Sequence, residues 1–139
     1  MNQTQRLTRS LKTFGSFQRG WSFGEGLPVD AGVIDRLESL VIKAERESLQ
    51  ADVFPGLNGE GAISFYLANP QGEFHSIEVV ITPEGTYDIH IERGKGFNPT
   101  HLVSGENFTE VDAGEMIDAW IDHVRSGRSH SPVKPVSFV

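Results

Sequence analysis

The chain shows two hydrophobic periodicities. Apolar residues recur every three or four positions over residues 33–48 and again over residues 113–124, which predicts two amphipathic helices. Asp30 is placed to cap the N-terminus of the first helix. Between the helices, apolar and polar residues alternate with a period of two, as in strands, over residues 62–68, 73–82 and 86–93.

Short turn sequences join the alternating segments, so we expect these segments to form an antiparallel meander. Each predicted strand has one apolar face and one mostly polar face, as in a sheet that is covered on one side only. Residues 101–103 are a candidate for a short fourth strand. The predicted fold is α+β: an antiparallel three- to four-stranded meander with one helix before it and one after it, both packed on one face.

The chain is expected to contain one domain with two flanking segments. Residues 1–13 are basic and have little periodicity, so we interpret them as an N-terminal arm, either frayed or a short helix. Residues 14–127 form the predicted single α+β domain. Residues 128–139 contain proline and serine and are interpreted as a loose C-terminal tail.

Charge and composition restrict the partners and the location. The formal net charge is −7, and all 19 acidic residues lie within residues 21–124. Such a body repels phosphate, which argues against nucleic acid and favours another protein with a basic surface. The sequence has neither an apolar run long enough to span a membrane nor a signal peptide. Together with the lack of cysteine, this favours a cytoplasmic protein with no membrane partner, and a homo-oligomer is compatible with it.

Aromatic rings are concentrated in the segment FGSFQRGWSFGEG, residues 14–26, which also contains four glycines. Large rings bury much surface and can fix a glycine-rich segment onto a core. Arg19 is the only basic residue in the segment, whereas base stacking requires a positive surround. We therefore interpret the segment as a structural aromatic strap, with a partner- or ligand-contact surface as the alternative. Its rings are Phe14, Phe17, Trp21 and Phe23.

Candidate chemical groups occur on the polar face of the predicted sheet. Asp88, His90 and Glu92 alternate along one strand, and Glu78 lies on the strand before it. Residues two apart on a strand are about 7 Å apart at Cα, which is wide for sharing one metal ion. No metal or cofactor is predicted, and no catalytic residues are assigned. Glu78 and His90 are kept as candidate partner-binding residues, with a merely solvated face as the alternative.

A second candidate surface lies on the second predicted helix. Glu115, Asp118 and Asp122 recur on the side away from its apolar stripe. Acidic residues on a helix usually form its solvated face, but a row of them can also attract a basic partner. We call these three residues the acidic ridge and treat them as candidate partner-binding residues.

Two short motifs resemble those of a group of short bacterial α+β proteins. The first motif, W-x-x-G-x-G-x-P, precedes the first helix, and a V-x-P-x-x-x-G turn then leads into an I-x-F strand. The matching residues, within residues 20–92, are Trp21, Gly24, Gly26, Pro28, Val53, Pro55, Gly59 or Gly61, Ile63 and Phe65. The resemblance implies an α+β fold and carries no catalytic residues.

These patterns lead to two functional hypotheses. The favoured one is a non-enzymatic, acidic protein-binding module, such as an immunity protein, an antitoxin or a phage-type inhibitor, that masks a basic partner surface. The alternative is a small enzyme or ligand-binding subunit whose site forms on the polar sheet face within an oligomer. A stoichiometric protein partner that co-purifies from the native host would distinguish the first from the second.

Overall fold

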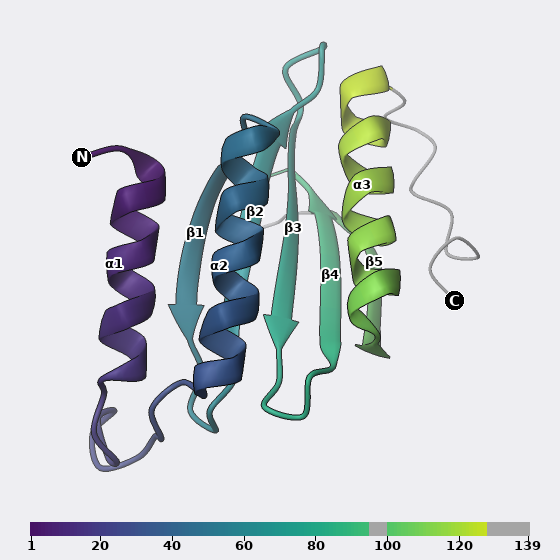
Figure 1. Cartoon of the computed structure of the whole chain (residues 1–139). Helices are drawn as coiled ribbons and strands as arrows, with labels where there is room; N and C mark the ends of the chain where they lie inside the picture. The colour runs from purple at the N-terminus through teal and green to yellow at the C-terminus, as the bar shows by residue number, and fades with distance from the viewer. Residues whose placement is uncertain (95–99, 128–139) are drawn as a thin grey trace.

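A computed structural model describes residues 1–94 and 100–127. The described residues form three helices and five strands (Figure 1). In chain order, these are α1 (Gln3–Gly15), α2 (Ala31–Arg46), β1 (Gln50–Pro55), β2 (Gly61–Ala68), β3 (Phe74–Ile81), β4 (Tyr87–Arg93), β5 (Thr100–Phe108) and α3 (Glu110–Ser126).

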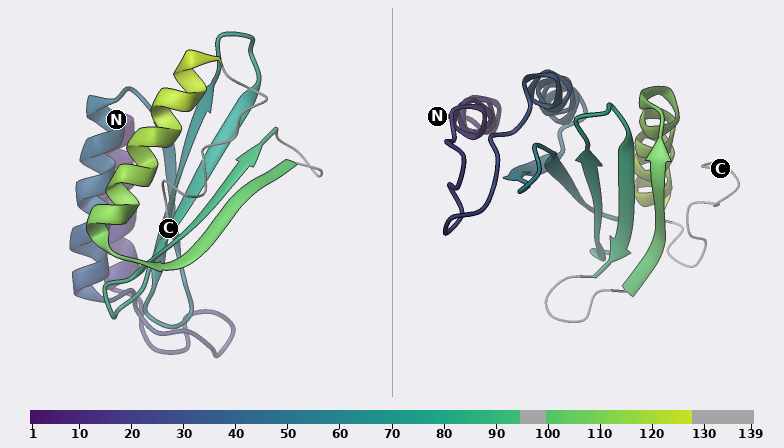
Figure 2. Two further views of the ribbon diagram at one scale, coloured as in Figure 1. Left: turned by 90° about the vertical axis from the view of Figure 1, so that its right-hand side faces the viewer. Right: turned by 90° about the horizontal axis from the view of Figure 1, so that it is seen from below.

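The strands form one antiparallel sheet in the order β1-β2-β3-β4-β5. All three helices lie on the same face of this sheet, and the other face is left open by the described elements (Figure 2). Helix α2 packs over β1, β2 and β3, α3 packs over β2, β3 and β4, and α1 packs on α2 and β1. The result is a two-layer arrangement with the core between helices and sheet.

The predicted α+β class is confirmed, but the numbers of strands and helices are wrong in detail. The strand expected at residues 101–103 is part of the longer β5. Strand β1 was not predicted, because QADVFP has little alternation and ends in a proline. Helix α1 was considered only as part of an arm, because Leu7 and Leu11 are its only buried residues. Residues 128–139, the predicted tail, lie outside the described residues.

Helix α1 is anchored to the edge of the sheet. Its Gln3 side chain donates a hydrogen bond to the carbonyl oxygen of Leu49 at 2.9 Å and accepts one from the amide of Ala51 at 3.1 Å. Arg6 forms an ion pair with Asp52 on β1 at 3.3 Å. Edge strands expose unpaired backbone groups that invite pairing with other chains. Gln3 therefore satisfies backbone groups at the start of β1 and covers part of its free edge.

The core lies between the inward positions of the strands and the apolar stripes of α2 and α3. Trp120 and Phe65 are the largest fully buried side chains, each with 0% exposure. The stripe predicted on the second helix is confirmed, since its members are all buried in α3: Ala113, Met116, Ile117, Trp120, Ile121 and Val124. Gly127 ends this helix with a φ of 77°, in the left-handed conformation that glycine adopts at little cost.

His75 is a polar residue inside this core. It is 1% exposed on the helix-covered side of β3, and neither of its ring nitrogens has a hydrogen-bond partner among the described residues. Its ring meets that of His123 on α3 edge-on, with 6.4 Å between the ring centroids. Burial lowers the pKa of His75, Glu73 opposes this effect, and His123 and Arg93 add to it.

We expect the stability of the fold to decrease as the pH falls below about 6.5. The pKa of His75 is lower in the folded state than its ordinary value of 6.5, so the unfolded chain takes up this proton first. The contribution of neutral His75 to stability is fully present above the pKa that it has in the unfolded chain. This contribution is lost as the pH falls towards the lower pKa that His75 has in the folded state. Urea unfolding of the wild type and of His75→Phe across this pH range measures the effect. The variant should lose less stability on acidification, and parallel profiles would assign the acid sensitivity to other groups.

Candidate functional site

The open face of the sheet carries the polar positions of the central strands. Antiparallel pairing places Asp52 beside Ser64, Ser64 beside Glu78, and Glu78 beside His90, so one row of side chains crosses four strands. The alternate positions Ile77, Val79 and Ile81 of β3 are buried under the helices, which leaves Glu78 exposed on the other side. The sequence pattern correctly assigned the covered and open faces of β2, β3 and β4, because apolar and polar positions alternate there.

Four carboxylates, Asp52, Glu78, Asp88 and Glu92, occupy this open face on β1, β3 and β4. We call them the acidic sheet face. Asp52 is paired with Arg6, and Oε1 of Glu92 lies 2.8 Å from Nε2 of His90. Asp88 accepts a hydrogen bond from the amide of Asn107 at 2.9 Å. Glu78 is exposed and has no ion-pair partner within residues 1–94 and 100–127.

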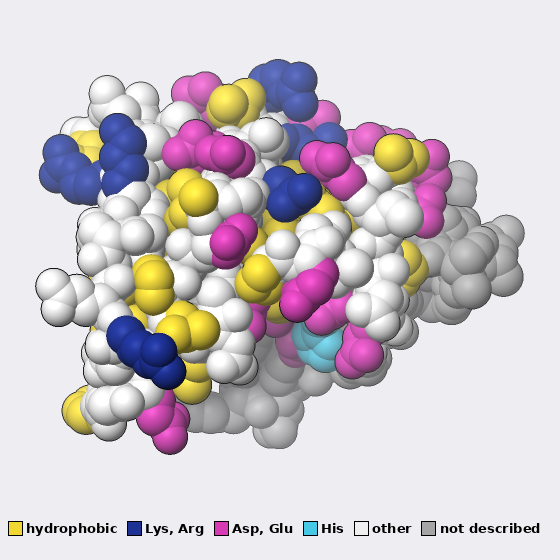
Figure 3. All heavy atoms as spheres, turned by 60° about the horizontal axis from the view of Figure 1, so that its bottom comes forward, with side chains coloured by type: hydrophobic (Ala, Val, Ile, Leu, Met, Phe, Trp, Pro, Cys, Tyr) yellow, Lys and Arg dark blue, Asp and Glu magenta, His cyan; other side chains and the backbone are white. Residues whose placement is uncertain are grey.

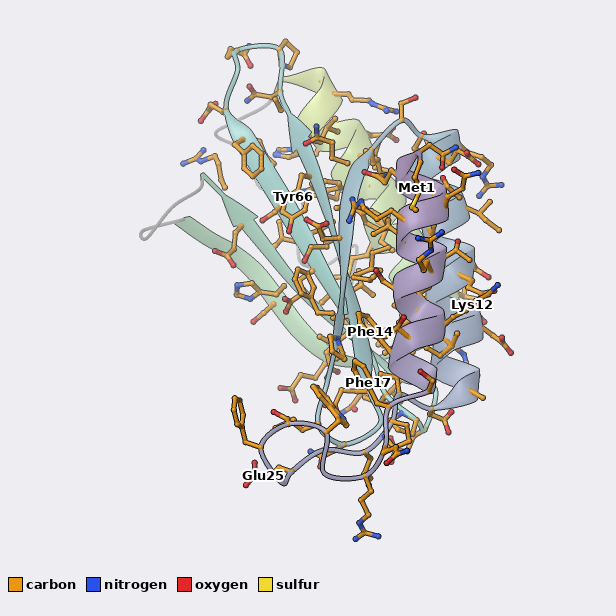
Figure 4. The ribbon with its side chains drawn as sticks, turned by 90° about the vertical axis from the view of Figure 1, so that its left-hand side faces the viewer. Met1, Lys12, Phe14, Phe17, Glu25 and Tyr66 are labelled. Carbon is orange, nitrogen blue, oxygen red and sulfur yellow. The ribbon has the colours of Figure 1, made fainter. Side chains whose placement is uncertain are left out.

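Aromatic side chains border the acidic sheet face. The rings of Tyr66 and Phe74 on β2 and β3 lie 5.8 Å apart between centroids, and Phe54 at the end of β1 is 43% exposed. Figure 4 shows Tyr66 on the sheet, on the side away from α1. Carboxylates flanked by partly exposed rings combine polar contacts with apolar area, a composition found in protein–protein interfaces.

The arrangement of the polar groups gives no metal centre within the described part of the chain. No group of three histidine, aspartate or glutamate side chains lies close enough there to hold an ion. His90 and Glu92 do meet, which the spacing of residues two apart did not suggest, because their side chains lean towards each other along β4. The absence of a metal or cofactor stays a prediction.

The acidic ridge lies on the helix-covered side of the molecule, opposite the acidic sheet face. Glu115, Asp118 and Asp122 are all exposed on α3, as predicted from their spacing. Asp118 is not a free charge, however, because its Oδ1 lies 2.5 Å from Nζ of Lys43 on α2. The two helices flank a groove of about 560 Å³, which is lined by Lys43, Arg46, Glu47, Asp118, Ile121 and Asp122. Lys43 and Arg46 thus offset the charge of this part of the ridge.

Three rings of the strap lie in series, from Phe14 in the last turn of α1 to Trp21 in the loop after it. Phe14 and Phe17 lie 5.7 Å apart between centroids, and Phe17 and Trp21 lie 4.6 Å apart. The indole nitrogen of Trp21 donates a 2.7 Å hydrogen bond to the carbonyl oxygen of Leu27, which closes the loop. Figure 4 shows Phe14 and Phe17 at the lower end of α1, with Glu25 farther down on the side of the open sheet face. The fourth ring, Phe23, stands apart and is fully exposed.

Comparison with known proteins adds no relative from which function could be inferred. No protein-family model matches the chain, and no curated protein or solved structure is significantly similar to it. The functional interpretation therefore depends on the surfaces described above.

Within residues 1–94 and 100–127, no helix combines the length and the apolar character that crossing a bilayer requires.

Proposed function

We propose that the chain is a non-enzymatic binding module that docks on a basic surface of another protein through its acidic sheet face. The observation that supports this most is the uncovered sheet face itself. Four neighbouring strands present carboxylates and partly exposed rings there, while all three described helices pack on the opposite side (Figure 2).

Charge favours the acidic sheet face over the acidic ridge as the docking surface. Lys43 and Arg46 line the same groove as Asp118, and Lys43 is paired with it. A positively charged partner that approaches the groove is therefore both attracted and repelled. On the sheet face, Glu78 has no ion-pair partner among the described residues, and the residue opposite it on β4 is His90, which pairs with Glu92. Like charges gathered on one surface steer an oppositely charged partner during encounter.

The positions of the groups with displaced pKa values support a non-enzymatic role. Burial raises the pKa of Tyr87, as it lowers that of His75, and both residues lie on the helix-covered side of the sheet. Catalytic groups with displaced pKa values usually lie in an accessible cleft. The burial of His75 and Tyr87 fits a structural role. The open sheet face offers carboxylates and partly exposed rings for binding instead.

The class of partner follows from this chemistry: a protein whose own function uses a basic surface, such as a toxin or a defence protein that contacts nucleic acid. Masking such a surface is the work of immunity proteins, antitoxins and phage-type inhibitors. The lack of cysteine in this chain suits a cytoplasmic location.

We expect Glu78→Lys to slow association with the partner that co-purifies from the native host by about tenfold at low salt. The matched control is Glu115→Lys, which makes the same charge change at an exposed position of the acidic ridge. Association rates measured at low and high salt should differ between the two variants only at low salt, because salt screens exposed charges. If Glu115→Lys slows association while Glu78→Lys does not, the ridge is the docking surface.

A further inference from the structure

Large hydrophobic side chains are exposed together at one end of the molecule. Leu27 follows the strap, and its amide donates a 2.8 Å hydrogen bond to the carbonyl oxygen of Leu57 in the β1–β2 hairpin. Of the seven large hydrophobic side chains exposed among the described residues, three lie in these two segments away from the acidic sheet face: Phe23, Leu27 and Leu57. We call this region the strap end. Figure 3, which brings the lower end of the molecule forward, shows hydrophobic side chains gathered there.

Phe23 is the most exposed of these side chains. Its exposed fraction is 105%, and its φ of 54° lies in the left-handed region that residues other than glycine rarely adopt. The loop around it is tightly closed, because Ser22 and Glu25 exchange backbone hydrogen bonds of 2.7 and 2.9 Å. A strained backbone that is held in place is a frequent feature of binding sites. The loop thus holds the backbone of Phe23 and directs its ring into solvent.

A hollow lies next to this loop. It measures about 670 Å³ and is lined by Gly15, Leu27, Pro28, Val29, Asp30, Ala31, Asn58, Gly59, Pro83 and Glu84. Aliphatic and proline side chains dominate this lining, so it suits an apolar side chain. Leu27 both follows the loop and lines the hollow, which makes the projecting ring and the hollow adjacent parts of one surface.

Exposed charged side chains lie near both features. The loop carries Arg19 and Glu25, and Arg19 has no ion-pair partner among the described residues. Asp30 and Glu84 line the hollow and are also exposed. A surface that carries a projecting ring with an available arginine, and a hollow with two carboxylates, offers matching contacts to a second copy related by a two-fold rotation.

We propose that two copies of the chain associate through the strap end, with Phe23 of each copy inserted into the hollow of the other. This reciprocal insertion buries both Phe23 rings. It also brings Arg19 of one copy near Asp30 and Glu84 of the other. This interface is separate from the acidic sheet face, so the proposal does not rest on the proposed function. An aromatic side chain seated in a pocket is the usual energetic centre of a protein interface.

The first test is sedimentation over a concentration series. The wild type should show a reversible monomer–dimer equilibrium, and Phe23→Ala should raise its dissociation constant by about 30-fold or more, as loss of an interface hot spot does. Ile42→Ala is the matched control, because Ile42 is 52% exposed on α2, away from the strap end. A wild type that stays monomeric at every concentration, or a dimer that persists in Phe23→Ala, would overturn the proposal.

Cysteine cross-linking tests the geometry independently of affinity, because the chain has no native cysteine. A mixture of Glu25→Cys and Ala31→Cys chains should form disulfide-linked pairs under mild oxidation, since Glu25 lies near Phe23 and Ala31 lines the hollow. The linkage should be lost when Phe23→Ala is added to the Glu25→Cys chain. Equal linkage in a mixture of Glu25→Cys with Ile42→Cys would show random collision and contradict the inserted ring.

Discussion

Replacing Trp120 by alanine is expected to lower the free energy of unfolding by about 3–5 kcal/mol. Trp120 is fully buried between α3 and the sheet, so the truncation removes its contacts and leaves a cavity. Its indole nitrogen has no hydrogen-bond partner within the described residues, so no polar contact there is lost with the ring. Urea unfolding gives the change directly.

The second tryptophan of the chain is the matched control for this experiment. Trp21 is only partly buried and contacts Phe17 and the carbonyl oxygen of Leu27 rather than the core between helices and sheet. We expect Trp21→Ala to cost about 1–2 kcal/mol, from one hydrogen bond and one ring contact. A larger loss for Trp21→Ala than for Trp120→Ala would mean that the strap, and not the packing of α3, is the main stabilising element.

Replacing Gly26 by alanine is expected to cost about 2–4 kcal/mol. Gly26 has a φ of 101°, and a Cβ atom there would lie 2.6 Å from the indole nitrogen of Trp21. The new methyl group would push the ring away from Phe17 and break its hydrogen bond to Leu27, in addition to straining the backbone. Thermal unfolding measures the loss of stability, and the fluorescence of Trp21 reports the displaced ring.

Gly24 supplies the control for this substitution. Its φ of 90° imposes a similar backbone strain, but a Cβ atom there meets nothing within 4 Å. Gly24→Ala should therefore cost only about 1–2 kcal/mol and leave the tryptophan fluorescence unchanged. Equal losses in the two variants would show that the Trp21 ring adds nothing to the stability of the loop.

Strict periodicity explains what could be predicted from the sequence. The stripe of α3 and the alternation in β3 and β4 each assign a buried face without reference to other elements. The polar positions of β3 and β4 and the acidic ridge follow from the same patterns, because they alternate with the apolar positions, whereas Asp52 on β1 does not. Glu78 and His90 were correctly expected on one face, and the register places them side by side.

Features that depend on distant contacts could not be predicted in this way. Strand β1 has a weak pattern of its own and is defined by its pairing with β2 and by the side chain of Gln3. The ion pair of Asp118 with Lys43 joins residues 75 positions apart, so the ridge looked more acidic in the sequence than in the structure. Composition grouped Phe23 with the other strap rings, but the turn between Ser22 and Glu25 directs it outward.

The two proposed interfaces lie on different surfaces and respond differently to mutation. Docking through the acidic sheet face depends on charge, so its rate is sensitive to Glu78→Lys and to salt. Self-association through the strap end depends on one apolar ring, so it is sensitive to Phe23→Ala. A variant that loses one of these properties and keeps the other would show that the two surfaces act independently.

Footprinting of carboxylates tests the proposed docking surface most directly. Carbodiimide coupling labels exposed carboxylates, and mass spectrometry compares the free chain with its complex with the co-purified partner. The account predicts that Glu78 and Asp88 on the acidic sheet face lose labelling in the complex, while Glu115 and Asp122 on the acidic ridge keep it. Protection of the ridge with unchanged labelling of the sheet face would contradict the account.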